Sequence, residues 1–173
     1  MKRGGKRIAG FVLLWSFLGG CTSLGGRFAP LGAPPFSLSD VAEEGDAARR
    51  ASVRLVLTGL DDDQALHPAR ALALYERALQ VDPNNPFAYL ALARHHVDGA
   101  DPEQALAFLD KADALLADSE VRSPGLEADL LGIRGSALQA SGRVRSALPL
   151  LEEARRLSPS VWDDARLDAR ELR

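Results

Sequence analysis

Three short stretches of this 173-residue chain decide its fold: residues 71–78 (ALALYERA), 105–112 (ALAFLDKA) and 147–154 (ALPLLEEA). Each begins and ends with alanine, has leucine at its second position, and has tyrosine or leucine at its fifth. Residues at i, i+1, i+4 and i+7 lie on one side of an α-helix. The pattern therefore predicts three equivalent helices, with small residues where a neighbouring helix packs closely.

The spacing of these stretches indicates a stacked repeat. The first two begin 34 residues apart, and the third begins 42 residues after the second. A period of 34 is typical of helix–turn–helix units that stack on one another. The extra eight residues fall around 120–127 and correspond to about two helical turns. Asp101-Pro102, followed by Gln104, supplies an N-cap, a proline at the first helical position and a capping-box partner, so a helix is expected to begin there.

Composition favours a helical fold of one domain plus a tail. The chain is 46% hydrophobic, enough for a core, and only 6% aromatic. Alanine, leucine and arginine, all strong helix formers, are its commonest residues. Valine and isoleucine are too sparse for a fold rich in strands. We therefore predict an all-α domain.

Segments 52–85, 86–119 and 128–161 resemble tetratricopeptide repeats (TPRs). Pro83 and Pro159 stand where that family ends its second helix. The small residues at the crossing point of the first helix are Gly59, Ala93 and Gly135. The resemblance implies that residues 46–160 form about three TPR-type hairpins in a short right-handed α-solenoid. A generic bundle of helical hairpins is the alternative.

Two further expectations concern the ends of this repeat domain. Asp61-Asp62-Asp63 interrupts the first copy, so its leading helix is expected to be frayed and these acids to form a solvated turn. After the third copy, residues 161–173 have an apolar stripe at helical spacing, made by Trp162, Ala165, Ala169 and Leu172. Stacked repeats need their exposed ends covered. We predict a capping helix there, and a docking helix for a partner is the alternative.

The family resemblance also implies a binding surface. TPR arrays present the first helix of each hairpin along a concave face that holds a segment of a partner protein. The corresponding groove positions are Phe87, Leu90, Arg94 and Asp98 in the second copy, and Asp129, Gly132, Ser136 and Ala140 in the third. Phe87 and Leu90 side by side would form an apolar patch of the kind that marks binding sites. The alternative is that the preceding tether or the first helix covers them.

The N-terminus predicts export and lipid anchoring. Residues 1–20 carry four basic residues and no acid, followed by a short apolar run from 8 to 17 (IAGFVLLWSF). That run is too short to cross a bilayer as a helix and has the layout of a secretory signal. Leu18-Gly19-Gly20-Cys21 resembles the lipobox of bacterial lipoproteins, which implies cleavage between Gly20 and Cys21 and acylation of Cys21. A plain signal peptide and a short membrane anchor are the alternatives.

Between the predicted signal and the repeats, residues 21–45 are expected to form a flexible tether rich in glycine and proline. In the alternative, Phe28, Leu31 and Phe36 pack back onto the domain. Thr22 after the cysteine, where family experience associates aspartate with inner-membrane retention, favours the inner leaflet of the outer membrane, facing the periplasm.

The sequence offers little sign of catalysis, of a cofactor or of a metal site. His95 and His96 are adjacent, so on a helix they point about 100° apart and do not share one metal ion. The three acids at 61–63 have neither the glycine nor the downstream glutamate of a calcium loop. After removal of residues 1–20 the chain carries 17 basic and 24 acidic residues, which disfavours nucleic acid as a partner.

These inferences converge on an anchored adaptor. The expected function is that of a membrane-tethered periplasmic scaffold that binds a protein partner through its concave face. TPR lipoproteins of similar layout take part in secretion or pilus assembly, in outer-membrane assembly, or in the regulation of peptidoglycan enzymes. The alternative is a structural lipoprotein that self-associates through uncovered repeat ends, with Trp162 as a candidate contact.

Overall fold

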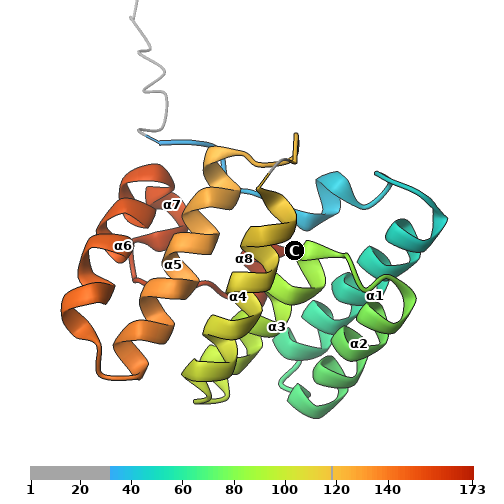
Figure 1. Ribbon diagram of the computed structural model, residues 1–173, viewed down its shortest axis with the longest axis horizontal. Coiled ribbons are helices and arrows are strands. Elements are labelled where there is room, and N and C mark those ends of the chain that lie inside the picture. The colour runs from blue at the N-terminus through green and yellow to red at the C-terminus, as the bar shows by residue number, and fades with distance from the viewer. Residues whose placement is uncertain (1–31, 118) are drawn as a thin grey trace, which may run out of the picture.

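The computed structural model describes residues 32–117 and 119–173, and this part of the chain is built from helices (Figure 1). A 3-10 turn, η1, comes first, six longer α-helices follow, and two single helical turns close the chain. Their bounds are η1 Leu38–Val41, α1 Ala47–Gln64, α2 Pro68–Val81, α3 Pro86–Asp98, α4 Pro102–Leu116, α5 Pro124–Ala140, α6 Val144–Leu157, α7 Pro159–Trp162 and α8 Ala169–Leu172.

The six long helices form three antiparallel hairpins, α1–α2, α3–α4 and α5–α6, stacked in chain order (Figure 1). The first helices of the hairpins also contact one another, α1 with α3 and α3 with α5. These three helices form what is called below the inner face. The alanines of the repeated motif are buried, including Ala71, Ala78, Ala105 and Ala112. The TPR-type all-α fold predicted from the sequence is therefore confirmed.

Local sequence signals set the helix boundaries. The carboxylate of Asp101 accepts a hydrogen bond from the Gln104 amide, and Pro102 begins α4, as predicted. Pro68, Pro86 and Pro124 begin α2, α3 and α5 in the same way, where a missing N–H costs nothing. Gly142 turns the chain between α5 and α6 with a φ of 78°, a conformation that favours glycine.

The first hairpin corrects the expectation of a frayed helix. α1 is continuous over 18 residues and includes all three acids of 61–63. The helix does end there, but Asp63 is not solvated, since its side chain is only 7% exposed. Arg94 and His95 of α3 provide the contacts that hold it. The repulsion that the acidic run would cause in isolation is thus relieved by the neighbouring hairpin.

The eight extra residues before the third hairpin lie in the loop after α4 and in the first turn of α5, which begins at Pro124 rather than near 128. Gly125 in that turn contacts the backbone of residues 34–36 closely. A Cβ atom at 125 would lie 2.5 Å from the carbonyl oxygen of Pro34. The insertion therefore gives the N-terminal segment a surface on which to pack.

The predicted flexible tether is wrong for its described part. Residues 33–41, the strap, run across the ends of the inner helices from α7 towards α1 (Figure 1). The amide of Ala33 donates to the carbonyl of Leu157, and Phe36 stacks on Phe87 with ring centroids 5.7 Å apart. Phe36, Leu38 and Val41 are buried. Of the residues proposed to pack back, Phe36 does so, whereas Phe28 and Leu31 lie outside the described residues.

The predicted capping helix over 161–173 is also wrong in form. Residues 158–173, the C-terminal segment, contain only the single turns α7 and α8, joined by a non-helical stretch. The segment turns back from α6 and crosses the inner face until α8 packs on α1. Trp162, Leu167 and Leu172 are buried along it. It covers the inner face of the array instead of capping its end.

The strap and the C-terminal segment meet beside α1. The backbone oxygen of Arg173 accepts hydrogen bonds from the Ser39 amide at 2.9 Å and from the hydroxyls of Ser37 and Ser39. Two segments from opposite ends of the described chain thus hold each other in place. Within the described residues, no helix combines the length and hydrophobicity that a membrane crossing requires.

Candidate binding site on the inner face

The apolar half of the predicted groove is covered. Phe87 is 4% exposed and stacks on Phe36 of the strap, and Leu90 is fully buried. The expectation that these two residues form an exposed patch is therefore wrong. The alternative, that the preceding segment covers them, is confirmed for the contact between Phe36 and Phe87.

The equivalent positions at the start of α5 lie beneath Trp162. The indole ring occupies the space above Gly132, where a Cβ atom would come within 2.3 Å of it. Its Nε1–H donates a 3.0 Å hydrogen bond to Asp129, whose side chain is buried. Asp129 is thus a contact for the chain's own C-terminal segment, and the structure does not leave it available to a partner. Trp162, 1% exposed, is equally unavailable for self-association.

Burial changes the acidity of this carboxyl group. Removal from water disfavours the charged form and raises the pKa of Asp129 to about 7. The hydrogen bond from Trp162 opposes that rise, and the nearby charge of Glu171 adds to it. We therefore expect the contact between α5 and the C-terminal segment to depend on pH near neutrality.

The other half of the inner face is open. A hollow of about 420 Å³ lies between α3, α5 and the C-terminal segment. Four of the predicted groove residues line it: Arg94, Asp98, Ser136 and Ala140. Its apolar wall includes Val97, Ile133, Trp162 and Leu167, and Arg166 stands at its edge. The structure thus brings together part of the predicted groove in a smaller site, which we call the first hollow.

A second hollow of about 410 Å³ lies on the other side of Arg166, at the turn between α1 and α2. Asp63, His95, Asp98 and Leu66 line it, together with Pro68 and Gly99. Asp98 and Arg166 line both hollows, so their side chains form the partition between them.

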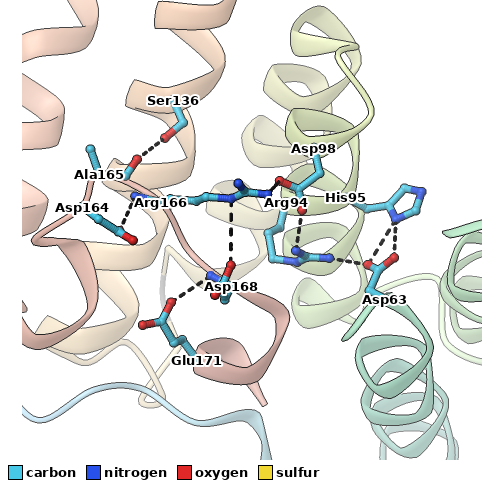
Figure 2. A network of polar contacts seen from close by, with 10 residues as sticks. All are labelled: Asp63, Arg94, His95, Asp98, Ser136, Asp164, Ala165, Arg166, Asp168 and Glu171. Atoms are coloured by element: carbon cyan, nitrogen blue, oxygen red, sulfur yellow. Dashed lines mark hydrogen bonds and ion pairs between the residues drawn. The ribbon is translucent and has the colours of Figure 1, made fainter. Parts of the chain in front are cut away.

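A chain of ion pairs joins the three elements around this partition (Figure 2). Arg94 of α3 pairs with Asp63 of α1 and, at 2.8 Å, with Asp98 one turn further along α3. Asp98 pairs in turn with Arg166 of the C-terminal segment at 3.1 Å. Arg94 is 5% exposed, so it is committed to these two carboxylates, whereas the Arg166 side chain is 65% exposed.

Asp63 is the buried centre of this network. Burial alone would raise the pKa of Asp63, but the hydrogen bond with His95 and the charge of Arg94 outweigh it and hold the pKa below its ordinary value. The hydroxyl of Tyr75 also donates to it at 2.9 Å. An ionised Asp63 thus links α2 and α3 to the end of α1 and gives the open half of the face a rigid base.

Of the terminal residues that complete this site, the sequence predicts packing of Phe36 only in the alternative to a flexible tether and places Trp162 in a capping helix. Sequence reasoning missed Arg166. Arg166 lies opposite the predicted stripe and gave no signal, because its partner Asp98 is 68 residues away.

The remaining predicted sites are not brought into this region. Gly20 and Cys21, the predicted cleavage and lipidation residues, lie outside the described residues. Among residues 32–117 and 119–173, no group of three or more potential ligand side chains has the arrangement of a metal site. His96 packs beside Phe108, with ring centroids 5.3 Å apart.

Comparison with known proteins finds one family model that matches part of the chain and one solved domain with a similar fold. Residues 64–130 match the family model described as tetratricopeptide repeat. The fold is similar to the N-terminal domain of stress-induced protein-1 (STI-1) from C. elegans, with 17% sequence identity and a TM-score of 0.56. That match covers 70% of this chain and 96% of the other. No curated protein sequence matches the chain.

Residues 64–130 are therefore similar to tetratricopeptide repeats, and the domain has a TPR-like fold. TPR domains are generally non-catalytic modules for interaction between proteins, and the comparisons identify no enzyme family. In this domain the chain's own ends cover the apolar half of the inner face, and the polar half remains open.

Proposed function

We propose that this chain is a lipid-anchored protein of the bacterial cell envelope whose TPR domain holds a segment of a protein partner. The observation that carries the interaction role is the open first hollow on the inner face, lined by both apolar and charged side chains. A concave site with apolar walls and a few placed polar groups is the usual form of a ligand site. The envelope role is supported by the lipobox-like Leu18-Gly19-Gly20-Cys21.

The anchor and the domain would lie close together. Only ten residues separate Cys21 from Gly32, the first described residue. A fully extended chain of that length spans at most about 40 Å. A lipid on Cys21 would therefore keep the domain near the bilayer surface. We propose the periplasmic side of the outer membrane as the location and an envelope assembly as the context.

The anchoring proposal is tested by Cys21→Ser, with Ser23→Ala as the matched control. Expressed in a diderm bacterium, the control should fractionate with membranes and carry the mass of acyl chains on its N-terminal peptide. The Cys21→Ser protein should lose both the acyl mass and the processing at residue 20. Recovery of the unmodified Cys21 thiol from wild-type protein would contradict the proposal.

The partner proposal is tested by photo-crosslinking from the first hollow. A photoreactive residue replaces the exposed Gln139, which lines the hollow, and in a control chain it replaces the exposed Arg145 of α6. A discrete adduct with one envelope protein is expected from position 139 and not from position 145. Equal labelling from the two positions, or none from either, would remove the hollow from the proposal.

Self-association is the second candidate, and one observation favours it. Val144 and Leu148 are 46% and 60% exposed and lie one turn apart on α6, the last long helix of the array. If this surface joined two copies, sedimentation would show a concentration-dependent dimer that Leu148→Asp abolishes. A monomer at all concentrations would dismiss this candidate.

A further inference from the structure

The partition between the two hollows is held by a solvent-exposed ion pair. The ion pair between Arg166 and Asp98 separates the hollows of about 420 and 410 Å³. The Arg166 side chain is 65% exposed, and an ion pair so accessible to water contributes little to stability. Moving this one side chain would join the two hollows.

The rest of the C-terminal segment is much harder to displace. Trp162 and Leu172 are buried to 1% and 0% exposure at its two ends, and burial of such side chains is a large stabilising contribution. The segment is therefore expected to stay in place if the Arg166 side chain moves. Asp168 gives Arg166 a second partner, since its carboxylate lies 3.9 Å from Nε while the present pair is intact.

Charge balance defines what would take the place of Arg166. Besides Arg166, the charged residues that line the two hollows are Asp63, Asp98 and Arg94, with His95 counted as neutral. Two carboxylates then face one guanidinium, so the joined site carries one negative charge. An incoming cation restores neutrality at Asp98, whereas an incoming carboxylate faces repulsion. The described residues as a whole carry 23 acids against 16 bases, which favours the same kind of partner.

The walls on either side of Asp98 are apolar. Val97, Ile133 and Leu167 line the first hollow, and Leu66 lines the second. Leu66 is 86% exposed and has a φ of 59°, a region that branched residues seldom adopt. This φ belongs to the turn between paired helices, since Ala100 and Gly142 have φ values of 59° and 78° at the equivalent turns. The exposed Leu66 side chain adds apolar surface beside Asp98.

We propose that the joined hollows bind a partner protein through a basic side chain, arginine or lysine, flanked by aliphatic residues. The basic group pairs with Asp98 in place of Arg166, and the aliphatic neighbours occupy the walls around Val97 and Leu66. Arg166 is the internal competitor for this site. The inference rests on the proposed function only in that it assumes a protein partner, and it names that partner's chemistry.

The test uses the full chain in detergent with Trp15→Phe, so that Trp162, which lines the first hollow, is its sole indole. The probe is the peptide acetyl-Ala-Leu-Arg-Leu-Ala-amide, titrated at pH 8 while Trp162 fluorescence is recorded. Two comparison peptides carry glutamate or glutamine in place of arginine. Only the arginine peptide is expected to change the Trp162 signal with saturation.

Substitutions of Arg166 and Asp98, the two residues of the partition, test the inference. Arg166→Ala should tighten binding of the arginine peptide about threefold to fivefold, because the competitor is gone. Asp98→Asn should weaken it at least about fivefold. The matched control is Arg156→Ala, which removes an equally exposed arginine (67%) paired with Glu153 elsewhere. Circular dichroism checks that each variant remains helical, and Arg166→Gln replaces Arg166→Ala if it does not.

The inference is overturned if the arginine peptide binds Arg166→Ala no more tightly than wild type, or if the glutamate peptide binds equally well. The inference is also overturned if the arginine peptide gives no saturable change in Trp162 fluorescence with either wild type or Arg166→Ala. These results come from purified protein and are independent of acylation and envelope crosslinking. A positive peptide result with no envelope partner would leave the inference standing and count against the proposed function.

Discussion

The two halves of α3 show how one helix face can be used in two ways. Both halves carry positions that the TPR resemblance assigned to a groove. In the first half, Phe87 and Leu90 are 4% and 0% exposed, and Phe36 of the strap stacks on Phe87. In the second half, Arg94 is held in ion pairs and the Asp98 side chain remains 35% exposed beside the first hollow.

This difference indicates which part of the inner face the free protein can leave exposed to water. An exposed apolar groove is costly in water, and the chain's own ends cover it here with Phe36, Trp162 and Leu167. A surface of paired charges carries no such cost, so it remains available without destabilising the free protein. The partner proposed above would therefore meet the polar half of the face first.

The largest expected effect comes from Trp162→Ala, which removes the main anchor of the covered region. The change opens a cavity above Gly132 and leaves buried Asp129 without its donor. The free energy of unfolding should fall by about 3–5 kcal/mol. Urea unfolding followed by circular dichroism measures this loss.

The matched control is Leu148→Ala, since Leu148 is 60% exposed. Its free energy of unfolding should lie within about 0.5 kcal/mol of wild type. Should Trp162→Ala prove as mild as this control, the C-terminal segment would not be part of the core, and the contrast between the two halves would be lost.

A second effect is expected from Asp129→Asn and depends on pH. Because the pKa of Asp129 is raised to about 7 in the fold, the unfolded chain releases this proton at lower pH than the folded one. The contribution of Asp129 to the free energy of unfolding is largest in acid, declines as the pH rises towards 7, and does not change further above that pH. At pH 8 the asparagine variant should be more stable by about 2–4 kcal/mol, and at pH 4 equal to wild type.

Unfolding titrations in urea at pH 4, 6 and 8 measure this dependence, with exposed Asp40→Asn as the control. Asparagine keeps an oxygen that accepts the Trp162 indole N–H, so the contact itself is preserved. If the unfolding free energies of wild type and Asp129→Asn changed with pH in parallel, the pKa of Asp129 would not be raised by folding, and this prediction would be wrong.

The smallest of the three effects is expected from Phe36→Ala, which loosens the strap. Phe36 is 8% exposed and stacks on Phe87, but it lies at the edge of the core, so the loss in unfolding free energy should be about 2 kcal/mol. Hydrogen exchange should accelerate at the amides of Ala33 and Ser39, whose acceptors lie in other elements. Unchanged exchange at both amides would mean that the strap is held without Phe36.

Much of the fold was predictable because its signals are local. The alanine motif at 71–78 and its copies specify helices and their close-packed sides within eight residues. The N-cap Asp101 and the first-turn proline Pro68 specify helix starts in the same way. The candidate site was predictable only in part: Arg94, Asp98, Ser136 and Ala140 line the first hollow, whereas Phe87, Leu90 and Asp129 are covered.

The sequence by itself determined the three helical hairpins, their order and their small-residue contacts, since helical periodicity and capping act between residues a few positions apart. Only the tertiary structure decided where the two ends of the described chain pack. The partners of Phe36 and Arg166 are 51 and 68 residues away, so no periodicity joins them. Their position follows from the need to remove apolar inner-face surface from water, a property of the assembled array.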